Sequence, residues 1–293
     1  MYGFGKRLRT VWLLTALCFC GCSATPEPPE SVQETALPSA NSPDALTEYT
    51  VSALAAALPA MTLSCAVPSD AVEPALRAAQ EQSVLLRTGL TGFRWTLADG
   101  VLKCEFRYSA DADALLRERT GLALYAAQFA ESAAQFSLPE CALLAHDRLL
   151  RECRYTEGAV QGDSAAGALL YHEAECGGFA EAFALLAEFC ALPCRIINGT
   201  ANGTPHAWNL VQLEGIWYHI DCAWDADASD PHAYFLCSDS DMAPTHKWDC
   251  TAYPAADGGA LSYSAIVSEM PGIRGSSPYR SSAASARISH RIS

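Results

Sequence analysis

The sequence ECGGFA at residues 175–180 leads directly into EAFALLAEF at residues 181–189, a run rich in Ala, Leu and Phe. This composition predicts a helix that begins at or beside Cys176. At a helix N-terminus the unpaired amides and the positive end of the helix dipole favour a thiolate over a thiol. Gly177 and Gly178 have no side chains, so we expect them to leave space for a substrate backbone beside the sulfur. The ECGGFA segment therefore predicts a reactive cysteine.

A second stretch, HAWNLVQLEGIWYHIDCAW at residues 206–224, predicts a β-hairpin with a two-residue turn at 214–215. Residues alternate between the two faces of a strand, and opposed residues share a face. His206 and Asp221 should therefore be diagonal neighbours on one face, about 7–8 Å apart at Cα. At that separation one hydrogen bond can join the imidazole to the carboxylate. The predicted pairs are Leu213 with Ile216, Val211 with Tyr218 and Trp208 with Asp221.

Together these stretches predict a nucleophile, a base and a group that orients the base. Cys176 is the predicted nucleophile, His206 the general base and acid, and Asp221 the orienting carboxylate, with Asp225 as the next candidate. Other polar residues nearby are expected to have surface, packing or supporting roles: His219, His146 and Asp147. The alternative interpretation is a polar hairpin face beside an inert cysteine.

Three segments resemble the core motifs of the transglutaminase-like superfamily: CGGFA at 176–180, HAWN at 206–209 and WYHIDCAWD at 217–225. SAAGALL at 164–170 and HKW at 246–248 are similar to segments of exported bacterial members. The resemblance covers residues 140–250 and implies an α+β, papain-like fold in which the cysteine helix packs on an antiparallel sheet. It also implies the three catalytic roles above, and that Trp208 and Asn209 shape the substrate pocket.

The N-terminus has the pattern of an export signal. Three basic residues within the first nine positions precede an apolar stretch at 11–21, which is too short to span a bilayer as a helix. GCS at 21–23 resembles a bacterial lipobox, with Phe19 where Leu is usual. We therefore expect Cys22 to be lipidated and the protein to be held on the extracytoplasmic face of the cell membrane. The alternative is ordinary signal-peptide cleavage, with Cys22 left unmodified.

The rest of the chain divides by composition. A segment rich in Pro, Ser, Glu and Thr follows the signal, and a Ser-rich segment with Arg but no acidic residue ends the chain. Between them, a first α/β pattern includes a strand at 61–67, a helix at 72–87 and a hairpin around 98–100. The predicted parts are a signal peptide (1–21), a disordered tether (22–48), a small α/β module (49–112), the main α+β domain (113–270) and a disordered basic tail (271–293).

Charge and cysteine spacing exclude several classes of function. The formal net charge is −14, which argues against nucleic acid as a partner because phosphate binding needs clustered Lys and Arg. The chain holds 13 cysteines but no CxxC pair. Cys190 and Cys194 are four positions apart, but no second pair beside them completes a zinc site. We therefore expect no metal and no cofactor.

These observations predict an extracytoplasmic thiol enzyme that forms an acyl-cysteine on protein or peptide amides, with substrates at the cell surface or cell wall. Hydrolysis is favoured over amine transfer, because water needs no binding site and nothing outside the core resembles an amine-donor site or a calcium loop. The alternative is a non-catalytic surface module that keeps the fold while binding protein or wall material.

Overall fold

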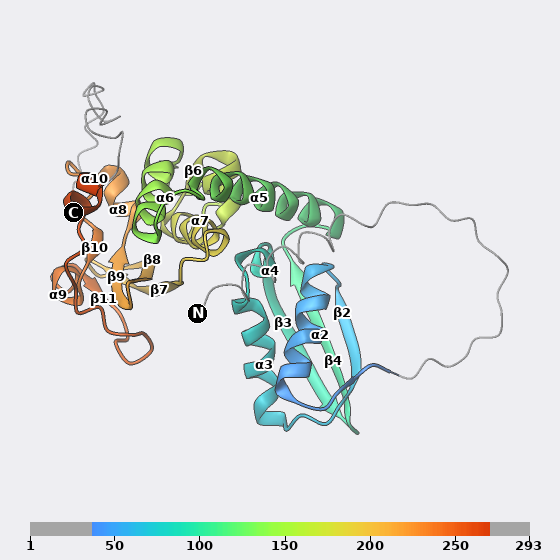
Figure 1. The fold of residues 1–293 in the computed structure, drawn as a ribbon. Coiled ribbons are helices and arrows are strands. Elements are labelled where there is room, and N and C mark those ends of the chain that lie inside the picture. The colour runs from blue at the N-terminus through green and yellow to red at the C-terminus, as the bar shows by residue number, and fades with distance from the viewer. Residues whose placement is uncertain (1–36, 270–293) are drawn as a thin grey trace.

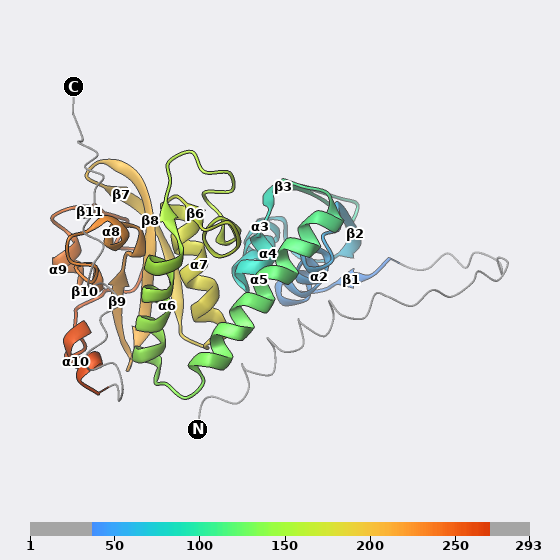
Figure 2. The ribbon, with the colours of Figure 1, turned by 90° about the horizontal axis from the view of Figure 1, so that it is seen from above.

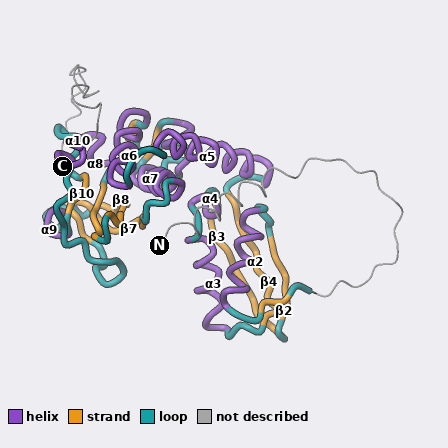
Figure 3. The backbone as a smooth tube through the Cα atoms, viewed as in Figure 1, coloured by secondary structure: helices purple, strands orange, loops and turns teal. Residues whose placement is uncertain are grey.

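The computed structural model describes residues 37–269, which form a small module (residues 39–108) and a main domain (residues 112–269) (Figures 1 and 3). The predicted α+β class is confirmed. The predicted signal peptide, Cys22, the first part of the tether and the tail at 271–293 lie outside the described residues. Within 37–269, no helix has the length and apolar character needed to cross a membrane.

The small module is a four-stranded sheet with helices on one face (Figure 1). The strand order is β1-β2-β4-β3, and apolar side chains of the sheet and of α2 and α3 form one core. The turn between β3 and β4 has positive φ at Asp99 (51°) and Gly100 (71°), as the predicted Asp-Gly turn requires. Its elements are β1 (Ser39–Ala40), α2 (Pro43–Ala55), β2 (Ala60–Cys65), α3 (Ser69–Glu81), α4 (Val84–Arg87), β3 (Leu90–Ala98) and β4 (Val101–Tyr108).

Two boundaries in this module differ from the prediction. The tether was expected to extend to residue 48, but β1 and the first half of α2 occupy 39–48. Ser42 accepts a hydrogen bond from the amide of Ala45 and Pro43 fills the first turn, so a capped helix begins there. The helix expected at 72–87 is broken, because Ser83 caps a separate turn, α4.

The main domain is built on a five-stranded antiparallel sheet of order β10-β9-β8-β7-β11. Helices α6 and α7 lie on one face of it, and α9 lies toward the other side (Figure 2). Its helices are α5 (Ala112–Ala133), α6 (Leu138–Glu152), π-helix η1 (Gly167–Tyr171), α7 (Cys176–Phe189), α8 (Cys222–Asp227), α9 (Asp239–Met242) and α10 (Tyr263–Glu269). Its strands are β5 (Arg154–Tyr155), β6 (Glu173–Ala174), β7 (Cys194–Ala201), β8 (Thr204–Leu213), β9 (Ile216–Ile220), β10 (Phe235–Cys237) and β11 (His246–Lys247).

The segment 199–205 connects two paired strands through a short turn. Strand β7 extends to Ala201, and β8 begins at Thr204. Asn202 and Gly203 form a tight turn with φ values of 48° and 83°, which suits a two-residue hairpin. His206 therefore stands on a paired strand, which holds it more firmly than a loop would.

Two elements join the small module to the main domain. The buried Arg119 on α5 donates hydrogen bonds to the backbone carbonyls of Thr88, Leu86 and Leu54 in the module. From α7, Glu181 forms an ion pair with Arg87 at 2.9 Å, and Glu188 accepts a hydrogen bond from the Val84 amide at 3.0 Å. The helix that begins with Cys176 is therefore held near its middle and at its C-terminal end by the small module.

Candidate active site

Helix α7 begins at Cys176, so its sulfur lies at the helix N-terminus that the sequence predicted. The side chain is half-buried and carries a free thiol. The amides of Gly177 and Ala207 donate hydrogen bonds to this sulfur. These donors and the helix dipole favour negative charge on the sulfur.

The two glycines after the nucleophile have a different role from the expected one. A Cβ on Gly178 would lie 2.2 Å from the Gly162 carbonyl oxygen and 2.8 Å from the Ala174 Cβ. The space beside Gly178 is therefore filled by the protein's own 162–164 segment, and no substrate can occupy it. A Cβ on Gly177 would come within 2.7 Å of a carboxylate oxygen of Asp163, so Asp163 occupies the space beside Gly177.

The hairpin register is the one predicted, up to its end. Leu213 pairs with Ile216 across the turn, Val211 pairs with Tyr218, and the ladder stops at Asn209 and Ile220. The expected pairing of Trp208 with Asp221 does not form, because Asp221 leaves the strand to cap α8, accepting a hydrogen bond from the Trp224 amide at 3.1 Å.

His206 and Asp221 nevertheless meet: His206 Nε2 lies 2.7 Å from Asp221 Oδ2. The other ring nitrogen, Nδ1, is then left for the hydrogen bond between His206 and the Cys176 thiol. Asp221 is fully buried, and the His206 side chain is only 7% exposed. The structure thus brings the three predicted residues into one chain of contacts from sulfur to imidazole to carboxylate.

The charges in this chain of contacts reinforce one another. Burial alone would raise the pKa of the Cys176 thiol, but hydrogen bonds from His206 and from the Ala207 amide lower it below its ordinary value. Burial disfavours a charged His206, yet its hydrogen bonds to Asp221 and Cys176 raise its pKa to about 9. Burial likewise opposes the Asp221 carboxylate, and the hydrogen bond from His206 lowers its pKa. At neutral pH the arrangement favours a thiolate–imidazolium pair beside a carboxylate.

The family model described as Transglutaminase-like superfamily matches residues 125–222, about a third of the chain, and this interval contains Cys176, His206 and Asp221. The chain carries a transglutaminase-like domain. No curated protein sequence matches the chain significantly.

Two solved structures are similar to parts of this chain. One, described as a TGase, is 15% identical, covers 47% of this chain and 46% of its own, and has a TM-score of 0.34. The other, described as a candidate cysteine protease from Cytophaga hutchinsonii, is 13% identical, covers 45% of this chain and 61% of its own, and has a TM-score of 0.32. The chain therefore spans less than two thirds of either protein.

His246 is a member of the transglutaminase-like site to which the sequence assigned no role. It is fully buried, and its Nε2 lies 3.1 Å from Asp221 Oδ2, the oxygen that also binds His206. Its Nδ1 lies 2.8 Å from Thr245 Oγ1. The only sequence feature that pointed to His246 was the resemblance of HKW at 246–248 to other family members. This resemblance did not indicate which residues His246 contacts. His246 is placed to hold Asp221 in position.

Trp208, Asn209 and His219 support the domain from within. Trp208 is 1% exposed, lies parallel to the His206 ring at 5.9 Å, and donates a hydrogen bond to His219. His219 is buried and also contacts Asp239, so its expected surface role is wrong and its supporting role holds. Asn209, also 1% exposed, donates to the Ala180 carbonyl of α7. Trp208 and Asn209 therefore act on the site through its framework and offer no surface to a substrate.

The surroundings of the nucleophile are acidic. Burial raises the pKa of Tyr155. The negative charges of Cys176, Glu175, Glu157 and Asp227 raise this pKa further. The carboxylates of Glu175, Glu157 and Asp227 form an acidic rim around Tyr155, whose ring is also close enough to feel the charge of Cys176. Such a rim attracts cationic groups at distances shorter than the Debye length of about 8–10 Å.

Asp225, the alternative orienting group, does not take part in these contacts. It lies on α8, where its carboxylate is 3.0 Å from His146 Nε2 and accepts a hydrogen bond from the Tyr234 amide. His146 is fully buried, so its expected surface role is excluded and the packing role remains.

Proposed function

We propose that the transglutaminase-like domain is a thiol enzyme that forms an acyl-Cys176 intermediate on protein or peptide amides. The observation that carries this proposal is the contact chain of Cys176, His206 and Asp221. A thiolate is the nucleophilic form of cysteine, and an oriented imidazolium beside it is the acid that a departing amine needs.

The reaction follows from the positions of these groups. The Cys176 thiolate adds to the amide carbonyl carbon, and the helix N-terminal amides stabilise the negative charge on the carbonyl oxygen. The C–N bond then breaks as the imidazolium of His206 gives its proton to the leaving amine. In the second half, His206 removes a proton from water, the hydroxide oxygen adds to the thioester, and the carboxylic acid and the thiolate are released. Asp221 keeps the ring oriented throughout.

The alternative function, a binding module without catalysis, explains less of the geometry. A binding surface has no need of a cysteine whose pKa is lowered, nor of a buried carboxylate shared between His206 and His246. Buried charged groups are costly to maintain, and such perturbed groups are concentrated at catalytic sites.

Two nucleophiles can complete the reaction. Hydrolysis is the outcome we propose, because water reaches a half-buried thioester without a dedicated site. The acidic rim is the specific observation in favour of the second candidate, amine transfer, since the carboxylates would concentrate a cationic primary amine such as a lysine side chain.

The choice between the two is tested by incubating the protein with a glutamine-rich protein and a fluorescent primary amine. We expect release of ammonia or peptide cleavage without incorporation of the amine, because water competes freely for the acyl-enzyme. Cys176→Ala is the control, and both signals must vanish in it. Incorporation that depends on Cys176 and exceeds hydrolysis would establish amine transfer instead.

We propose further that the protein is exported and anchored to the outer face of the cell membrane by a lipid on Cys22. The lipobox-like GCS segment and the short apolar stretch before it support this location. Substrates would then be proteins or peptides at the cell surface or in the cell wall.

The anchor predicts that the mature chain begins at Cys22 and partitions into detergent. Cys22→Ser should abolish this partitioning, while Cys20→Ser, the same exchange two positions earlier, should leave it intact. Mass spectrometry of the mature N-terminus and detergent phase separation measure both. A mature N-terminus at any other residue would exclude the anchor and leave the enzymatic proposal unaffected.

A further inference from the structure

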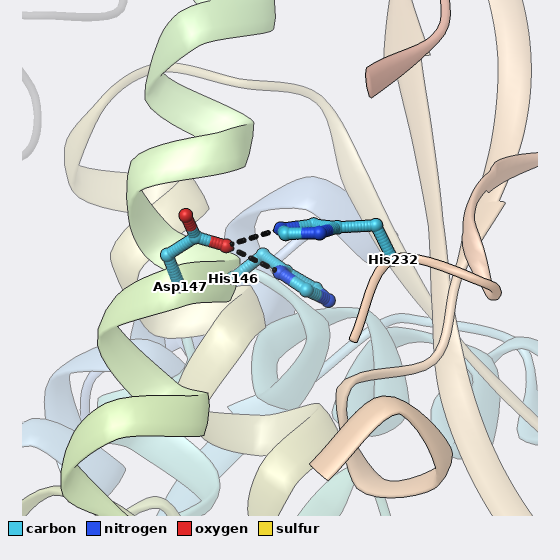
Figure 4. Close-up of side chains that lie close together, drawn as sticks. All are labelled: His146, Asp147 and His232. Carbon is cyan, nitrogen blue, oxygen red and sulfur yellow. Dashed lines mark hydrogen bonds and ion pairs between the residues drawn. The ribbon is translucent and has the colours of Figure 1, made fainter. Parts of the chain in front are cut away.

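A second cluster of histidine and carboxylate groups lies apart from the triad. His146 and Asp147 stand on α6, and His232 stands in the segment before β10 (Figure 4). His146 Nδ1 lies 3.0 Å from Asp147 Oδ1, and His232 Nε2 lies 2.8 Å from the same oxygen. Two imidazole nitrogens therefore converge on one carboxylate oxygen, although His232 lies 85 positions after Asp147 in the sequence.

Neighbouring side chains hold the imidazole rings of His146 and His232 in place. His146 Nε2 lies 3.0 Å from Asp225 Oδ2, and the other oxygen of Asp225 accepts from the Tyr234 amide. The His232 ring stacks on Tyr263 with centroids 3.7 Å apart and an angle of 14° between the planes. A carboxylate behind a histidine, as Asp225 stands behind His146, is the usual outer support of a metal ligand, because it fixes the tautomer whose free nitrogen faces the ion.

The number of protons that a neutral His146 carries leaves one of its two contacts with carboxylates to be filled by a cation. A neutral imidazole has one N–H, but both nitrogens of His146 face carboxylate oxygens. If Nε2–H donates to Asp225, Nδ1 presents a lone pair toward Asp147, and only a second proton or a metal ion makes that contact attractive. A divalent ion would balance the two carboxylates, Asp147 and Asp225, which otherwise leave net negative charge in a mostly buried region.

We propose that His146, Asp147 and His232 bind a divalent transition-metal ion of the zinc type. The ligand atoms would be His146 Nδ1, His232 Nε2 and a carboxylate oxygen of Asp147, with water as the fourth ligand. Two imidazoles and one carboxylate suit zinc and its neighbours better than calcium or magnesium, which prefer oxygen ligands.

The spacing and access agree with such an ion. Tetrahedral zinc with bonds of about 2.0–2.1 Å separates neighbouring ligand atoms by about 3.3 Å. The two distances to Asp147 Oδ1, 2.8 and 3.0 Å, are a few tenths of an ångström shorter than this, and the three ligand atoms all lie within 4.8 Å of one another. The Asp147 side chain is 27% exposed, which leaves a route for the ion and a place for the water.

The ion would stabilise the fold and leave the chemistry of the triad unchanged. It would link α6 to the segment before β10, and through His146 to Asp225 on α8, the helix that Asp221 caps. None of Cys176, His206 and Asp221 is among its ligands.

The test uses the protein with Cys176→Ala, stripped of metal by a chelator and titrated with Zn²⁺ alone. We expect one zinc ion per chain and a higher melting temperature at saturation. Asp147→Asn, which keeps the side-chain shape, and His232→Gln should each weaken binding at least about tenfold. His172→Gln, an exposed histidine outside the cluster, is the matched control and should bind as before. His246→Gln should also retain zinc, which separates this cluster from the one around Asp221.

Co²⁺ identifies the ligand types. Bound cobalt should show ligand-field bands without a sulfur charge-transfer band, because the proposed ligands are nitrogen and oxygen. If a cluster variant fails to fold, NMR of the histidine imidazoles in the protein with the cluster intact provides the test. Zinc should then change the signals of His146 Nδ1 and His232 Nε2. Equal zinc binding in folded His232→Gln, a sulfur band, unperturbed imidazole signals or no binding would overturn the proposal.

Discussion

Asp221→Asn is expected to lower turnover by about 10³- to 10⁴-fold at neutral pH while the protein still folds. The carboxylate accepts hydrogen bonds from His206 and His246 through one oxygen and from the Trp224 amide through the other. An amide keeps the shape and can still accept from Trp224. Its NH₂ group, however, favours the wrong tautomer of His206, and it cannot stabilise an imidazolium by charge.

The measurement is single-turnover acylation by an amide substrate, with circular dichroism to confirm the fold. Asp70→Asn makes the same exchange at an exposed position in helix α3 of the small module and should keep full activity. If the Asp221 variant remained almost fully active, the orienting group would have to be another residue. Asp225 would be a poor substitute, because it is bound to His146 and to the Tyr234 amide.

Cys176 is expected to react with iodoacetamide at least about tenfold faster than any other described cysteine at pH 6.5. An ordinary thiol with a pKa of about 8.5 is only about 1% ionised at that pH. The hydrogen bonds from His206 and the Ala207 amide lower the pKa of Cys176, so a larger fraction of it is thiolate. The lower intrinsic nucleophilicity of a low-pKa thiolate offsets part of this gain. Burial raises the pKa of Cys104, Cys153 and Cys237 to about 12, which slows their reaction further.

The pH dependence has a definite sign. As the pH falls through the lowered pKa of Cys176, the sulfur gains a proton and alkylation slows. As the pH rises through about 9, His206 loses its proton. The thiolate then remains, so alkylation persists, but amide cleavage declines because the leaving amine has no acid. Amide turnover should therefore be bell-shaped with an upper limit near pH 9, while alkylation should have only a lower limit.

Residue-resolved mass spectrometry after brief alkylation measures these rates. The exposed Cys250 is the internal comparison, since access alone would favour it. His206→Ala should remove most of the advantage of Cys176 by taking away its hydrogen bond and positive charge. Equal labelling of Cys176 and Cys250, or no effect of His206→Ala, would contradict the ion pair and with it the proposed enzymatic function.

Features that depend on short-range rules could be predicted from the sequence. The run at 181–189 required a helix that places Cys176 at its first turn, and Glu214-Gly215, with φ values of 52° and 85°, required the tight turn that sets the hairpin register. That register brings His206 close to the end of the strand before Asp221, and so the proximity of these two residues could be predicted from local pattern, although Asp221 itself leaves the strand to cap α8.

Tertiary structure decided what depends on segments far apart in the chain. Gly178 is needed because the 162–164 segment packs against it, and His246 contacts Asp221 from another strand. His232 reaches Asp147 across 85 positions, a distance at which spacing along the chain carries no signal, so the cluster that we propose as a metal site could not be found from the sequence. The physical reason is that such contacts are selected by packing of the whole core, whereas turns and helix starts are selected by neighbouring residues.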